Sequence, residues 1–243
     1  LRLNFKQINM KKFLSFILIF WVSFSFSQIW SSYGVKVAPE NEETVVKIMD
    51  DYFTNNKIEG VTVSLYSIMF TAADLDFTHE VIFSGEGDAM AKLYEPGFQD
   101  TAWQLFSSKI SNFVENVFSG QGWRNFNFGE TMPFQLVYTF KGDYEEINKW
   151  MAMESELNEK YPKDFRSFAA GGINAGGPSN EASHWMVTGW KTYADYNNNW
   201  VNNQKFRAEN PAFVKEKDRI EKNIDYSDVE FITKTMRVLV KQW

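Results

Sequence analysis

Two histidines and no cysteine limit the chemistry that this chain of 243 residues can perform. Without cysteine there is no thiol nucleophile, no thiolate zinc site and no cysteine-ligated iron–sulfur cluster. His79 and His184 lie far apart in the sequence, and neither belongs to an H-x-x-x-H or H-E-x-x-H motif. The sequence therefore predicts no metal site and leaves His79 and His184 as the candidate catalytic residues.

The two histidines occur in similar contexts, each near the start of a predicted strand with a glycine near its end, Gly85 or Gly189. If it lined a cavity, such a histidine could act as a general base or as an axial ligand to haem. The preferred interpretation is that each imidazole caps a strand end and bonds a backbone group. The His-to-Gly spacing differs by one residue, so without a bulge the two imidazoles are expected on opposite strand faces.

Aromatic side chains and one arginine are the candidates for binding a ligand. Aromatic residues make up 17% of the chain, and Tyr66, Trp185 and Trp190 fall in predicted strands. Core packing alone explains such an excess, and a ligand pocket lined by aromatic rings is the alternative. Arg166 is predicted within a strand, where its charge is either solvated or directed inward toward an anionic or carbonyl-bearing ligand.

A glycine-rich stretch, residues 171–178, is predicted as a flexible loop between two strands. Exposed backbone N–H groups in such a loop could cradle an anion. The stretch lacks the lysine of a P-loop and joins two strands, so a simple hairpin connection is the preferred interpretation.

The elements that must position these residues follow one order twice. In the second half, short aromatic and β-branched runs predict strands, and periodic apolar residues predict helices. The strands are expected over 134–140, 165–170, 183–190 and 229–240, and the helices over 143–161, 193–204 and from Pro211 onward. Asp143 and Glu146 have the spacing of a capping box at the start of the first helix. The order is βαββαβ.

The first half repeats this order. Strands are expected over 33–38, 61–70, 78–84 and 123–128, and helices over 39–53 and 101–117. The second helix has the most regular apolar period in the chain, ending with Val114 and Val117, and Thr101 and Gln104 have capping-box spacing at its start. We therefore expect two repeats, 32–129 and 132–243.

The predicted strands carry apolar residues on both faces, which decides how the repeats pack. A βαββαβ unit places both helices on one face of an antiparallel sheet, and a wet second face would alternate apolar and polar residues. Runs such as 66–70, 136–138 and 185–187 do not alternate. We therefore expect an α+β fold in which two ferredoxin-like repeats pack their antiparallel sheets face to face, with the helices outside.

This arrangement resembles the dimeric α/β-barrel superfamily, a ferredoxin-like group whose members pair as dimers or as tandem repeats. The resemblance covers residues 32–243 and rests on element order and two-faced burial, without the signature motif of a particular family. It implies an internal pseudo-dimer and a barrel cavity. Some relatives in the superfamily are cofactor-independent oxygenases or haem-handling enzymes.

Residues 10–27 predict export from the cytoplasm. Lys11 and Lys12 precede fourteen uncharged residues, and Ser25 and Ser27 supply the small residues of a cleavage site. The apolar run is too short to span a bilayer. We expect residues 1–27 to comprise an upstream segment and a signal peptide, with a periplasmic or secreted mature protein.

Charge restricts the partners. Loss of residues 1–27 removes four basic residues and no acid, which changes the net charge from −6 to −10. Nucleic-acid binding rests on cationic contacts with phosphate, so an acidic chain without a basic stripe is not expected to bind nucleic acid. We expect a monomer that contacts a membrane only through the signal peptide.

The sequence favours two functions, and nothing in it selects a third class, a purely structural partner protein. The first is an exported binding or accessory protein that holds a small apolar or aromatic molecule in the barrel cavity, without a cofactor. The second is a cofactor-independent monooxygenase-like or haem-processing enzyme that uses His79 or His184, and haem enters only under this alternative.

Overall fold

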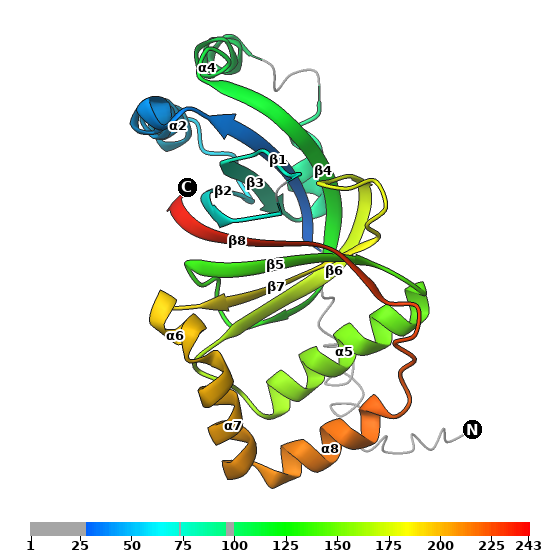
Figure 1. Cartoon of the computed structure of the whole chain (residues 1–243). Coiled ribbons are helices and arrows are strands. Elements are labelled where there is room, and N and C mark those ends of the chain that lie inside the picture. The colour runs from blue at the N-terminus through cyan, green and yellow to red at the C-terminus, as the bar shows by residue number, and fades with distance from the viewer. Residues whose placement is uncertain (1–27, 73, 96–99) are drawn as a thin grey trace, which may run out of the picture.

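The computed structural model describes residues 28–72, 74–95 and 100–243, so the expected signal peptide lies outside the described residues. In this part of the chain eight strands form one closed barrel in the order β1-β3-β2-β8-β5-β7-β6-β4. Helices lie on the outside, with α2 and α4 beyond one half of the barrel and α5, α7 and α8 beyond the other (Figure 1).

The first repeat has the expected βαββαβ order with one short additional helix. A 3-10 turn at Pro39–Asn41 precedes α2. The elements are β1 (Gln28–Val37), α2 (Glu42–Asn55), β2 (Val61–Phe70), β3 (His79–Gly85), α3 (Gly87–Lys92), α4 (Thr101–Ile110) and β4 (Val114–Phe128). The apolar residues of α2 and α4 and the outer faces of the strands form one core cluster outside the barrel.

The second repeat follows the same order. Its elements are β5 (Phe134–Lys141), α5 (Tyr144–Lys160), β6 (Ser167–Gly176), β7 (His184–Trp190), α6 (Tyr193–Asn197), α7 (Asn199–Glu209), α8 (Pro211–Glu221) and β8 (Glu230–Gln242). The Asp143 carboxylate accepts hydrogen bonds from the backbone N–H groups of Glu145 and Glu146, which explains why α5 begins there.

The two sheets are joined at both edges. β2 pairs with β8, and β4 pairs with β6, both antiparallel. The sheets therefore face each other as predicted, and hydrogen bonds between the repeats also close them into a barrel. Edge strands carry unpaired N–H and C=O groups, and closure satisfies these groups within a single chain.

The helix predicted over 101–117 is wrong in its second half. α4 ends at Ile110, and Val114 and Val117 belong to β4. Its N-cap is Asp100, whose carboxylate accepts a hydrogen bond from the Trp103 backbone N–H, and not Thr101. β-branched residues suit a strand, and pairing of this segment with β1 outweighs the local helical period.

The flexible loop predicted over 171–178 is also wrong for most of its length. β6 runs from Ser167 to Gly176 and pairs with both β4 and β7. Glycine is needed here because strands approach closely: a Cβ on Gly172 would lie 2.5 Å from Cζ2 of Trp123.

Candidate functional site

The barrel contains a cavity of about 170 Å³. Successive residues of a strand point to opposite faces, so alternate residues of each strand line it. The lining residues are Gln28, Ile29, Trp30, Ser32, Ser64, Tyr66, Glu80, Ile82, Ser84, Phe118, Arg124, Thr131, Gln135, Val137, Thr139, Ala169, Ile173, Gly177, Pro178, Trp185, Val187, Arg237 and Gln242. An engineered cavity of about 150 Å³ accepts benzene, so this cavity has room for about one aromatic ring.

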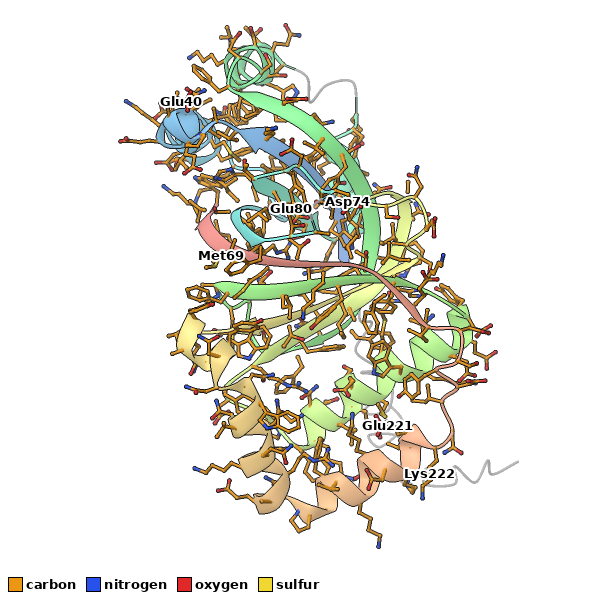
Figure 2. The ribbon with its side chains drawn as sticks, in the orientation of Figure 1. Glu40, Met69, Asp74, Glu80, Glu221 and Lys222 are labelled. Atoms are coloured by element: carbon orange, nitrogen blue, oxygen red, sulfur yellow. The ribbon has the colours of Figure 1, made fainter. Side chains whose placement is uncertain are left out.

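A polar network forms one wall of the cavity. Arg237 donates to Glu80 Oε2 at 2.5 Å and, through Nε and Nη2, to Gln135 Oε1 at 2.9 and 2.7 Å. The guanidinium lies 4.1 Å from the ring centroid of Tyr66, whose hydroxyl accepts from Gln135 Nε2 at 3.3 Å. Ser32 donates to the second oxygen of Glu80 at 2.5 Å. The charges of Arg237 and Glu80 thus compensate each other inside the barrel, where Figure 2 places Glu80 among the strands.

The opposite wall is aromatic. Trp30 of β1 and Trp185 of β7 meet edge to face, with ring centroids 5.8 Å apart. The Trp185 indole N–H donates to the Trp123 carbonyl at 3.2 Å, whereas the buried Trp30 Nε1 has no hydrogen-bond partner among the described residues. A Cβ on Gly122 would lie 2.6 Å from Trp30 Cζ2, so glycine at this position provides the space for the indole.

The two walls occupy equivalent positions in the two repeats. Val35 pairs with His79 in the first repeat and Phe140 with His184 in the second, so a shift of 105 residues relates them. The same shift relates Trp30 to Gln135 and Glu80 to Trp185. Two fold positions, one on β1 and β5 and one on β3 and β7, therefore carry the Trp30–Trp185 pair on one side of the cavity and the Gln135–Glu80 pair, bridged by Arg237, on the other.

Arg124 of β4 is the third charged residue that lines the cavity. It donates to the side-chain oxygen of Gln28, its cross-strand neighbour on β1. None of the ion pairs among the described residues includes Arg124, and burial lowers the pKa of its guanidinium. The cavity therefore carries a net positive charge, because Glu80 already compensates Arg237.

The histidines do not line this cavity. Their following residues, Glu80 and Trp185, point inward, so both imidazoles lie on the outer side of the barrel under the helices. The prediction of opposite faces is therefore wrong, because Gly85 and Gly189 are not equivalent: the shift of 105 residues that relates the two histidines relates Gly85 to Trp190. His79 Nδ1 lies 3.0 Å from the Thr78 hydroxyl.

His184 has the matching arrangement, with Nδ1 2.8 Å from the Ser183 hydroxyl. Burial lowers the pKa of both imidazoles, that of His184 to about 4. The His184 ring packs against Phe140 and Tyr144, and its buried Nε2 has no hydrogen-bond partner among the described residues. Both imidazoles are therefore buried outside the cavity, so neither could act on a ligand held inside it.

Two of the four predicted ligand-binding residues line the cavity, and the other two lie outside it. Tyr66 and Trp185 line the cavity. Trp190 packs outside the barrel and donates to Asn199 of α7 at 3.3 Å. Arg166 precedes β6 and pairs with Glu154 of α5 at 3.4 Å, so it is neither solvated nor directed into the cavity. Burial lowers the pKa of its guanidinium.

Among the cavity residues that the sequence did not indicate are Trp30, Glu80, Arg124, Gln135 and Arg237. The alternation of the strands contained a usable signal for Glu80, because His79 and Glu80 must face opposite sides. Arg237 lies in the predicted strand 229–240, but its partners are 102 and 157 residues away, and no local pattern indicates them.

The structure contains no group of three or more His, Asp or Glu side chains able to hold a metal ion among the residues it describes. No helix in the described ranges is long and apolar enough to cross a membrane.

No protein-family model matches the sequence, and no curated protein matches it significantly. Solved structures do match its fold. An anthrone oxidase-like protein aligns with a TM-score of 0.53 and 10% identity, covering 90% of this chain and 93% of that one. A candidate monooxygenase from Lactobacillus acidophilus aligns with a TM-score of 0.55 and 8% identity over 88% and 100% of the two chains.

A candidate chlorite dismutase aligns with a TM-score of 0.51 and 8% identity, covering 88% of this chain and 95% of that one. At such low identity these similarities concern the fold alone. Together with the closed eight-stranded barrel, they show that this protein has the fold of the dimeric α/β-barrel superfamily, formed by two ferredoxin-like repeats within one chain.

Proposed function

We propose that this protein binds a small molecule, about the size of one aromatic ring, inside the barrel. The observation that carries the proposal is the asymmetric cavity, with the Trp30–Trp185 pair on one wall and the Arg237 network on the other. Ligand sites combine apolar surface with a few placed polar groups, and this cavity has both.

Pre-organisation supports binding. Arg237 is held at once by Glu80, Gln135 and the Tyr66 ring, so its position does not depend on a ligand. Groups already held in place lose little conformational freedom when a ligand arrives, which favours affinity.

We further propose that the protein acts outside the cytoplasm, as a monomer and without nucleic-acid partners. The lysine pair and apolar run of residues 10–27 support export, the acidic charge opposes nucleic-acid binding, and barrel closure within one chain supports a monomer.

The test is a thermal-shift screen with one-ring aromatic and apolar compounds, repeated on two variants. Ala169 lines the cavity, and Ala169→Phe is expected to fill it and abolish ligand-induced stabilisation. Ala152 is exposed on α5, and Ala152→Phe is expected to retain the response. If no compound stabilises the wild type, or if Ala169→Phe responds equally, the ligand does not occupy the barrel.

The alternative proposal is a cofactor-independent monooxygenase-like reaction at the same cavity. The fold similarity to proteins described as anthrone oxidase-like or as candidate monooxygenases favours it. The histidines are poorly placed for this reaction, so Glu80 is the better candidate base. Oxygen uptake on addition of a stabilising compound, lost in Glu80→Gln and retained in His79→Ala and His184→Ala, would support catalysis. The absence of oxygen uptake would leave binding alone.

A further inference from the structure

We infer that the ligand of the barrel carries one anionic group, such as a carboxylate, which Arg124 binds while the apolar part lies against Trp30 and Trp185. This inference rests on the proposed function and specifies its ligand class.

One positive charge in the cavity has no counter-ion within the protein. Three charged side chains line the cavity, and the Glu80–Arg237 pair is neutral as a unit. Arg124 has a neutral side-chain partner, Gln28, in place of a carboxylate. A half-buried guanidinium without a counter-ion has lost hydration and gained no ion pair, so a bound anion would compensate it.

The wall that contains Arg124 also has hydrogen-bond donors available for a ligand. A guanidinium has five N–H donors arranged in a fork that matches a carboxylate. The wall next to Arg124 has another donor available, because Trp30 Nε1 is buried without a partner among the described residues. A carboxylate has two oxygen atoms, and this wall offers them the charged N–H donors of Arg124 and the neutral N–H donor of Trp30.

The register of β1 and β4 places Arg124 and Trp30 close together. Gln28 pairs with Arg124, and two residues further along β1, Trp30 pairs with Gly122. Residues two apart on a strand face the same side, about 7 Å from each other. The guanidinium and the indole are thus neighbours on the inner face of β1 and β4, and the missing side chain at Gly122 makes room for the Trp30 ring.

The opposite wall, in contrast, already contains a counter-ion for its arginine. There Gln135 occupies the position that is equivalent to Trp30, and Arg237 has Glu80 as its counter-ion within the protein. The Arg237 wall is therefore complete without a ligand. The Arg124 wall lacks one negative charge, and the ligand is expected to supply it.

The experiment compares benzoate with benzamide, which have nearly the same shape and differ in charge at neutral pH. Binding is followed by calorimetry and by tryptophan fluorescence, since Trp30 and Trp185 line the cavity. In the wild type we expect benzoate to bind at least tenfold more tightly than benzamide. Arg124→Gln should remove this preference, and Arg124→Lys, which keeps the charge, should retain part of it.

Arg219→Gln is the matched control, because Arg219 is an exposed residue of α8 outside the barrel, and the preference should survive this change. Circular dichroism and thermal unfolding establish that each variant is folded. Equal binding of both probes to the wild type, or an unchanged preference in folded Arg124→Gln, overturns the anionic-ligand inference while cavity binding stands. Failure of both probes to bind overturns the inference, and the wider compound screen then decides the proposed function separately.

Discussion

Glu80 and Arg237 are charged residues that the barrel interior accommodates because each compensates the other. Their side chains are only 12% and 7% exposed. Removing one member of such a pair leaves the other charged and poorly hydrated. The same residues hold Gln135 and Tyr66 in place, so the network links stability to the shape of the cavity.

We predict that Glu80→Gln lowers the free energy of unfolding by about 3 kcal/mol, because Arg237 loses its counter-ion. Urea unfolding at pH 7 measures this change. Glu181→Gln is the control, since Glu181 pairs with Lys141 on the exposed surface, and it should show no measurable loss. Equal losses in the two variants would contradict the view that the interior pair is special.

The two histidines predict a specific dependence of stability on pH. His184 has a folded-state pKa of about 4 and an ordinary pKa of 6.5, because burial disfavours the charged form. Between these values the unfolded chain binds more protons than the folded chain. The free energy of unfolding should therefore fall as the pH falls from 6.5 to 4, by up to about 1.4 kcal/mol per unit for this imidazole. Above pH 6.5 it contributes no slope.

Urea titrations at several pH values test this slope, with His184→Leu as the variant. The slope between pH 6.5 and 4 should become shallower, and His79→Leu should reduce it independently because the His79 pKa is also lowered by burial. Asp50, whose pKa is lowered to about 2 chiefly by its hydrogen bond with Lys241, acts below this window. An unchanged slope in both variants would show that the imidazoles ionise freely in the folded protein.

At the scale of the elements, the strands β4 and β6 determine the shape of the cavity. Both contain pairs of glycines that local patterns suggest are loops, yet pairing to two neighbours holds each as a strand. Their glycines accept neighbouring backbone or large indoles where a side chain would not fit. Gly122 is the clearest case, because its inner side is covered by Trp30.

We predict that Gly122→Ala lowers the free energy of unfolding by about 1–3 kcal/mol and weakens ligand binding, since the added methyl collides with Trp30 and the Gly172 carbonyl. Chemical unfolding and fluorescence titration measure the two effects. Gly87→Ala is the control: its Cβ would meet Ile29 at 3.6 Å, an ordinary contact, at the start of α3. Losses of equal size would argue against a steric role for Gly122.

At the scale of the whole molecule, closure is the feature that permits a monomer. The contacts β2–β8 and β4–β6 join the repeats at both edges, so the barrel has no open sheet edge for another chain. In Figure 1 the last strand, β8, lies between the two sets of helices and completes the ring of strands.

We expect light scattering to give the mass of one chain at micromolar concentrations. Deletion of residues 230–243 removes β8 and exposes the edges of β2 and β5, so this variant is expected to self-associate or unfold. A wild-type mass that rises to that of a dimer with concentration would contradict this prediction.

The sequence by itself determined the repeated βαββαβ order, the helices outside and the two-faced strands, because apolar period and turn residues are local properties. It also indicated two of the cavity residues, Tyr66 and Trp185. The tertiary structure alone decided where β4 and β6 run, since pairing with neighbouring strands outweighs a local helical or loop preference. It alone decided the cavity chemistry, because Glu80 of the first repeat meets Arg237 and Gln135 of the second only when the two repeats join.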